Sequence, residues 1–176
     1  MIALERDAFD TIRRAVATLH GVAHRPAFEA RVDAGACDVA RHRPSNFAVF
    51  MGYDFHLTPA GPRLIEVNTN AGGALLNGLH TASLCDPEKL ACACSDLMPV
   101  ETMQARLVAT FAAEHALARP GVPLRRVAIA DDHPAEQFLR AEFDLFARLF
   151  ASAGIEASVC DVRDLTYDGA GLTLGG

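Results

Sequence analysis

The sequence predicts an α/β protein built in two parts, and three observations carry this prediction. Two strand-like runs flank a turn-rich pentapeptide at 58–62, which indicates a β-hairpin. Apolar residues recur at helical spacing in several segments. After residue 125, an apolar strand, a long amphipathic segment and a second strand follow in the order of a parallel βαβ unit. The 176 residues are 51% hydrophobic, enough for one domain and part of another.

The first part, residues 1–120, contains four predicted helices around the hairpin. Phe9, Ile12, Val16 and Leu19 share one face of a helix over 3–20. A short helix follows over 26–33, and the hairpin strands are expected at 47–57 and 63–69. A third helix starts near residue 74, a variable connection covers 82–99, and a fourth helix covers 100–117.

Pro120, Gly121 and Pro123 predict a boundary, so the second part is residues 124–176. It should begin with a strand at 127–130. A helix over 135–153 follows, with Pro134 in its first turn and a buried stripe that includes Phe138, Phe146 and Phe150. A strand at 155–160 completes the unit. The chain stops just beyond a turn at 168–171, which favours an N-terminal piece of a longer protein.

The hairpin separates its side chains by chemistry. Symmetric pairing about Ala60 places 54 opposite 66, 52 opposite 68 and 56 opposite 64. Because side chains alternate along a strand, each face can be listed. One face is almost entirely apolar and is predicted to be the core face: Val49, Met51, Tyr53, Phe55, Leu57, Arg63, Ile65 and Val67. The other carries Gly52, Asp54, His56, Leu64, Glu66 and Asn68.

Two opposed carboxylates on that second face, Asp54 and Glu66, need a counter-charge. Like charges directly across a ladder destabilise it, and the symmetric pairing puts no Lys or Arg on this face. Asp, Glu and Asn oxygens suit Mg²⁺, which takes further ligands from water and phosphates. The sequence therefore predicts a magnesium site at Asp54, Glu66 and Asn68. His56 lies on the same face and could contact one of these metal ligands or the substrate, or it could be a structural histidine.

The segment Asn70-Ala71-Gly72-Gly73 leads from the second hairpin strand, which carries Glu66 and Asn68, into the third helix. Glycine permits positive φ and lets a ligand approach the backbone, and a helix N-terminus offers free N–H groups to an anion. Asn70, Gly72 and Gly73 are therefore predicted to contact phosphate or substrate.

The stretch GYDFHLTPAGPRLIEVNTNAGG resembles the metal-binding end of the ATP-grasp fold, in which one strand carries an acid and the next carries E-x-N before a small Gly-containing loop. The resemblance implies that Asp54, Glu66 and Asn68 hold the Mg²⁺ (or Mn²⁺) ions that bridge the phosphates of ATP. It implies an ATP-dependent carboxylate–amine ligase that works through an acyl phosphate, with a small carboxylate and an amine as substrates.

The order of the parts departs from the common ATP-grasp arrangement, because a Rossmann-like unit similar to the family's preceding domain follows the metal motif. This order resembles circularly permuted members, such as glutathionylspermidine-synthase-like and glutathione-synthetase-like proteins. The lysines that usually grip ATP are not found, since Lys89 is the only lysine. The missing parts are expected beyond Gly176, and this chain alone is expected to be inactive.

Two other interpretations stay open. The domain could be degenerate or non-catalytic and keep only the fold. Alternatively, the strand ending in Asp131 and Asp132 resembles the first strand of a response-regulator receiver, although no acid stands where the phosphorylated residue should be. An ordinary strand end, with Asp132 or His133 starting the next helix, would also explain these acids.

Composition excludes several classes. The formal charge of −6 and the absence of a basic run argue against nucleic-acid partners. No signal peptide or membrane-spanning run is evident, so a soluble cytoplasmic protein is expected. Five cysteines do not make a disulfide scaffold, and Cys85, Cys92 and Cys94 are either buried thiols or a zinc site. Whether the chain forms homo-oligomers stays open.

Overall fold

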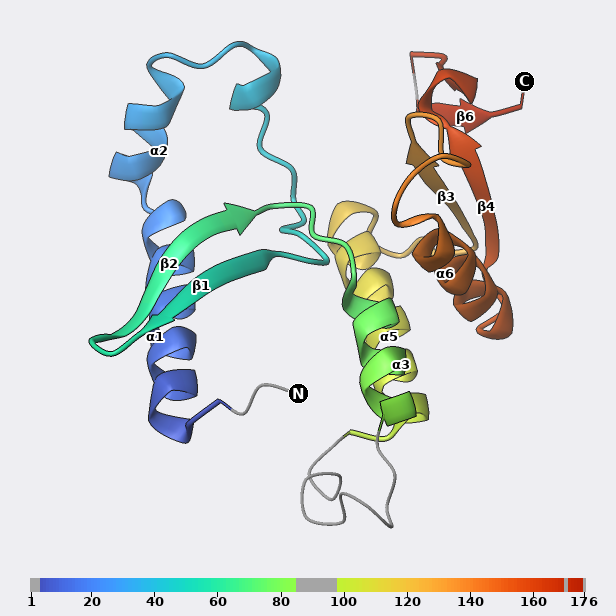
Figure 1. Cartoon of the computed structure of the whole chain (residues 1–176). Coiled ribbons are helices and arrows are strands. Elements are labelled where there is room, and N and C mark those ends of the chain that lie inside the picture. Colours follow the sequence, from blue (N-terminus) through green and yellow to red (C-terminus); the bar gives the residue numbers. More distant parts are fainter. Residues whose placement is uncertain (1–3, 85–97, 170, 176) are drawn as a thin grey trace. The chain divides into compact units, whose positions relative to one another are not determined.

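A computed structural model describes residues 4–84, 98–169 and 171–175, and the protein is of the α/β class (Figure 1). The chain divides into two compact units, Met1–Asn70 (unit 1) and Ala71–Gly176 (unit 2). Among the helices in the described ranges, none is both long enough and apolar enough to cross a bilayer.

Unit 1 consists of two helices and a hairpin: α1 (Arg6–Ala23), α2 (Pro26–Asp33), the short 3₁₀ turn η1 (Val39–Arg41), β1 (Gly52–Thr58) and β2 (Gly61–Asn68). Pro26 occupies the first turn of α2, where a missing N–H costs nothing. Helix α1 packs against β2. The helices over 3–20 and 26–33 and both strands are therefore confirmed, with β1 starting later than expected.

The predicted core face of the hairpin is wrong, because its side chains are only partly covered. Met51 and Val67 are each 39% exposed and Ile65 is 64% exposed. No residue in the described part of unit 1 is fully buried. The two strands form a sheet of their own, and α1 packs against β2.

Unit 2 contains the hydrophobic core. The described elements around this core are α3 (Ala74–Leu84), α5 (Val100–Ala118), β3 (Arg126–Asp131), α6 (Arg140–Ser152) and β4 (Glu156–Asp161). Strands β3 and β4 pair in parallel, and α6 packs on both, which confirms the βαβ order. Phe150 of α6 is 1% exposed, and its ring centroid lies 5.0 Å from Phe111 of α5.

Helix α3 contacts both α5 and α6. Gly78 permits a close approach to α5, because a Cβ there would lie 2.1 Å from the Met103 sulfur. These contacts explain why the two units divide at Asn70 and Ala71, whereas the sequence suggested a division at 120–124. Prolines and glycines mark that later turn, yet the helices on either side of it pack together.

The start of α6 differs from the prediction. The helix begins at Arg140 and not at 135, because His133 has a positive φ of 45° and the chain makes turns before it becomes helical. Pro134 is therefore not in its first turn, and neither Asp132 nor His133 caps it. Phe138 is 97% exposed, so its assignment to the buried stripe is wrong.

The end of the described chain forms a small hairpin. After the 3₁₀ turn η2 (Val162–Asp164), β5 (Leu165–Tyr167) pairs antiparallel with β6 (Leu172–Leu174). The residues that follow the turn at 168–171 thus form a strand that pairs with the residues before it. Cys85, Cys92 and Cys94 lie outside the described residues, as does most of the predicted connection over 82–99.

Candidate functional site

The β1–β2 hairpin turns through only two residues, Pro59 and Ala60. The Thr58 hydroxyl closes this turn, donating to the Gly61 carbonyl (2.8 Å) and accepting from the Ala60 N–H (3.2 Å). Gly61 follows with a φ of 101°, which favours glycine. The connection is thus shorter than the five-residue turn suggested by the sequence.

A β-bulge at Ile65 changes the register of this hairpin. From the turn, Thr58 pairs with Gly61 and the ladder continues without a break to Phe55 and Leu64. Continued unbroken, it would place Ile65 opposite Asp54 and would send Glu66 to the other face. The extra residue shifts the pairing by one, as bulges do, and brings Glu66 opposite Asp54.

Asp54, Glu66 and Asn68 come together as the sequence predicted. Asp54 lies directly opposite Glu66, and Gly52 lies opposite Asn68, so two of the three predicted pairings are confirmed. The Asn68 side-chain N–H donates to a Glu66 carboxylate oxygen at 3.0 Å, which places these two side chains on one face. All three residues are exposed, and within the described ranges neither carboxylate forms an ion pair.

The half of the hairpin next to the turn differs from the prediction. His56 pairs with Arg63, not with Leu64, because the bulge separates the two registers. Alternation along β1 then puts Arg63 on the side of Asp54, so a cation does belong to this face. His56 is exposed and lies two residues from Asp54.

The donors on this face suit a hard cation. Two carboxylates and an amide offer only oxygen ligands once the Asn68 carbonyl turns toward the ion, and such ligands favour Mg²⁺ over Zn²⁺. No cluster of three His, Cys, Asp or Glu side chains with metal-binding geometry occurs in the described residues. A cation on the hairpin would therefore depend on Asn68 and on ligands from water or a phosphate.

The predicted anion-binding segment has an internal partner. Glu142 of α6 is 3% exposed, and its carboxylate accepts from the N–H groups of Leu75 (2.9 Å) and Leu76 (3.2 Å). It also accepts from the Gly73 N–H. The backbone donors at the start of α3 thus face a carboxylate of the same unit.

A second polar cluster lies where β3 and β4 end. Asp131 and Asp161 are register partners at the carboxyl edge of the parallel pair, the usual position for ligands in open α/β sheets. The Asp161 carboxylate accepts from the His133 N–H at 3.1 Å and is ion-paired with Arg163. The Arg163 guanidinium also lies 3.6 Å from Asp132.

Arg163 dominates the electrostatics of this edge. Its side-chain hydrogen bond, followed by its backbone N–H, holds the pKa of Asp161 far below the ordinary range. The same hydrogen bond raises the pKa of Arg163. The acids at the strand ends therefore have a cation within the fold.

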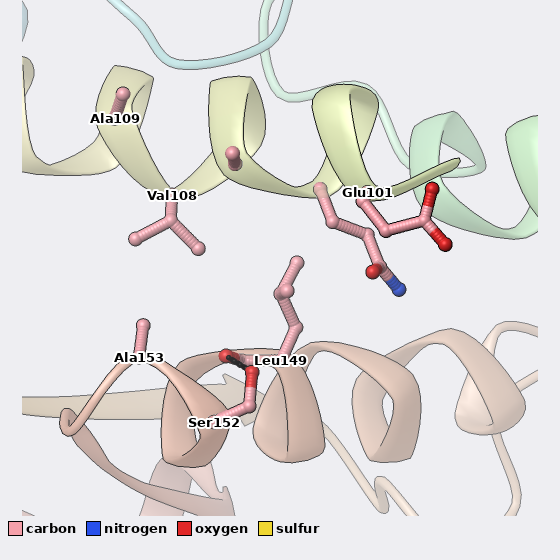
Figure 2. A pocket seen from close by; sticks show the side chains of 8 residues that line it. Glu101, Val108, Ala109, Leu149, Ser152 and Ala153 are labelled. Atoms are coloured by element: carbon pink, nitrogen blue, oxygen red, sulfur yellow. Dashed lines mark hydrogen bonds between the residues drawn. The ribbon is translucent and has the colours of Figure 1, made fainter. Parts of the chain in front are cut away.

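Two open grooves lie away from these residues, one in each unit. In unit 2 a space of about 430 Å³ separates α5 and α6, and Figure 2 shows Val108 and Leu149 pointing into it. Its walls are mainly small and apolar: Glu101, Gln104, Ala105, Val108, Ala109, Leu149, Ser152 and Ala153. The groove in unit 1, about 370 Å³, lies beside α2. Neither groove includes a predicted site residue.

The chain matches no known family model, no curated protein and no solved structure. Its function is therefore argued from the hairpin and the clusters themselves. Sequence reasoning missed two polar residues, Glu142 and Arg163. The first had a readable signal, because an acid at position 142 interrupts an otherwise apolar helical stripe. Arg163 had none, since Asp132 and His133, two of its three partners, lie about 30 residues away in the loop after β3.

Proposed function

We propose that this chain carries the metal-binding part of an ATP- and Mg²⁺-dependent carboxylate–amine ligase of the ATP-grasp type. One observation supports the proposal most strongly: a β-bulge places Glu66 directly opposite Asp54, with Asn68 bonded to Glu66. Opposed like charges cost stability, and a divalent cation removes that cost.

In this proposal Asp54, Glu66 and Asn68 hold Mg²⁺ or Mn²⁺ against the phosphates of ATP. A cation held there would supply charge neutralisation for transfer of the γ-phosphoryl group of ATP to the substrate carboxylate, with ADP as the leaving group. Attack of the amine on the acyl phosphate would then form the amide and release inorganic phosphate. Arg63, on the same side of the hairpin, is a further group that can approach a phosphate. The parallel β3–α6–β4 unit would take the place of the Rossmann-like unit that the circularly permuted order requires.

The hairpin supports this proposal more than the loop does. Asn70, Gly72 and Gly73 remain proposed phosphate or substrate contacts by resemblance. The Gly73 N–H, however, is bonded to Glu142. The metal residues are therefore the part to test first.

Metal titration with and without ATP tests the proposal. Binding of Mg²⁺ and Mn²⁺ is measured by calorimetry for the wild-type chain, Asp54→Asn and Glu66→Gln. The matched control is Asp38→Asn, which removes a carboxylate whose side chain is 99% exposed elsewhere in unit 1. Each site variant should lose at least about tenfold in affinity, while the control binds like wild type.

The effect of ATP on Mg²⁺ affinity then distinguishes a ligase from a protein that only binds metal. ATP should raise the Mg²⁺ affinity of the wild-type chain but not that of Glu66→Gln. In the protein at its natural length, both variants should lose Mg²⁺-dependent ATP turnover. Metal binding without an effect of ATP would favour a degenerate, non-catalytic domain, and unchanged metal binding by both variants would overturn the site.

A further inference from the structure

The start of α3 holds a buried carboxylate in a way that an ordinary helix cap does not. The carboxylate comes from Glu142, 69 residues further along the chain than Gly73. One oxygen accepts from Leu75 and Leu76, and the other accepts from Gly73. Three backbone donors thus converge on a single ligand with both of its oxygens in use.

The surroundings of this carboxylate are closed to water. Glu142 is the one charged residue in the described ranges that is fully buried. Both of its carboxylate oxygens have hydrogen-bond partners. A buried charge is tolerated only where hydrogen bonds replace its hydration. Here the N–H groups and the positive end of the α3 dipole do so.

The two glycines of the segment are explained by the same arrangement. A Cβ at Gly72 would lie 2.4 Å from a Leu139 methyl carbon and 3.4 Å from a Glu142 carboxylate oxygen. Gly73 has a φ of 92°, which favours glycine. The Gly-Gly pair therefore lets α6 approach the backbone, a requirement that exists without a bound phosphate.

We propose that the N-terminus of α3 is a carboxylate-binding site whose resident ligand is Glu142, and that Glu142 positions the Gly72-Gly73 segment. The N–H groups of Gly73, Leu75 and Leu76 are already committed to Glu142, so ATP or substrate reaches this segment only through other atoms. This last consequence rests on the proposed ligase function, whereas the carboxylate site itself does not.

Chemical rescue tests the assignment. Glu142→Ala leaves three donors facing an empty space, so its melting temperature should fall by on the order of 5 °C. Formate or acetate should restore a measurable part of that loss, and chloride at the same ionic strength should not. Asp144→Ala is the control, because Asp144 lies on the same helix in a half-buried ion pair with Arg140 and makes no contact with the α3 N-terminus that the structure records. Its melting temperature should not respond to formate.

Glu142→Gln provides a second variant that keeps the size and one acceptor oxygen. It should be more stable than Glu142→Ala and should gain nothing from formate. If formate and acetate rescue Glu142→Ala no better than chloride does, a carboxylate-binding site is overturned. An equal formate response in Asp144→Ala would overturn it too.

A titration of the wild-type chain needs no destabilised variant. Inorganic phosphate should leave the amide NMR signals of Gly73, Leu75 and Leu76 unchanged, because Glu142 occupies them. Shifts of these three signals at millimolar phosphate would show that the site opens to solute and would overturn the resident-ligand assignment. None of these readouts involves Mg²⁺ or Asp54, so this inference and the ligase proposal fail separately.

Discussion

Asp54 and Glu66 face each other across an antiparallel pair, one step beyond a bulge at Ile65. The ladder from the turn would otherwise have put Glu66 on the opposite face. Two-stranded sheets are marginally stable in water, and opposed carboxylates weaken them further. Repulsion between Asp54 and Glu66 thus destabilises the metal-free hairpin at one pair of positions.

Neutralising one member of the pair should strengthen the metal-free hairpin. In the presence of EDTA, Glu66→Gln should stabilise it by about 0.2–1 kcal/mol, since the cross-strand repulsion is lost while an acceptor for Asn68 remains. Amide hydrogen exchange of β1 and β2 measures this directly. Adding Mg²⁺ should slow exchange in wild type and have little effect in the variant. Faster exchange in Glu66→Gln without metal would contradict the expectation.

Removing the bulge should leave Glu66 opposite Asp54. Deletion of Ile65 makes the ladder continuous and still places Glu66 opposite Asp54, so Mg²⁺ affinity should stay within about threefold of wild type. Deletion of both Leu64 and Ile65 instead places Glu66 opposite Phe55, on the other face, and should abolish binding. Calorimetry on the two deletions, with circular dichroism to confirm folding, compares them. Equal affinities would exclude a role for register.

Two phenylalanines near α6 should differ sharply in their importance. Phe150→Ala empties a position that is 1% exposed and packed against Phe111, and should cost about 3–5 kcal/mol. Phe138→Ala changes a side chain that is 97% exposed and should stay within about 0.5 kcal/mol of wild type. Urea denaturation gives both free energies of unfolding. A large loss in Phe138→Ala would show that this residue is covered in solution.

The ion pair between Asp161 and Arg163 predicts a pH dependence at the edge of β4. The folded pKa of Asp161 lies below its ordinary value of about 4, so this group binds fewer protons when folded. Its contribution is therefore present at neutral pH and is lost as the pH falls through the folded pKa. Asp161→Asn should melt at a lower temperature than wild type at pH 7, and the difference should shrink below about pH 4. A constant difference down to pH 2 would contradict this origin.

The hairpin shows how far sequence reasoning reaches. Alternation and a turn signal were enough to pair Asp54 with Glu66 and Gly52 with Asn68. They could not show that the turn contains only two residues, because Thr58-Pro59-Ala60-Gly61-Pro62 is compatible with several turn lengths. The assumed five-residue turn and the unforeseen bulge compensated for each other beyond Ile65. Between the bulge and the turn the predicted register is off by one, so His56 pairs with Arg63, and Arg63 and Leu64 each lie on the face opposite to the one predicted.

Other differences come from contacts between distant residues. The start of α6 was placed five residues early because proline is favoured in a first turn, while His133 takes a positive φ that no local pattern indicates. The partly exposed apolar face of the hairpin could not be foreseen either. Alternation identifies which residues share a face but not whether another element covers it.

The absence of any fully buried side chain in residues 4–70 gives unit 1 a particular thermodynamic character. A segment without a core gains little free energy from folding alone, so whatever binds it contributes a larger share of its order. An ion at 100 times its dissociation constant adds about 2.7 kcal/mol to a folded state. If the hairpin binds Mg²⁺ as proposed, metal occupancy and folding of the hairpin are thermodynamically linked, and the free Mg²⁺ concentration then sets how much of unit 1 is structured.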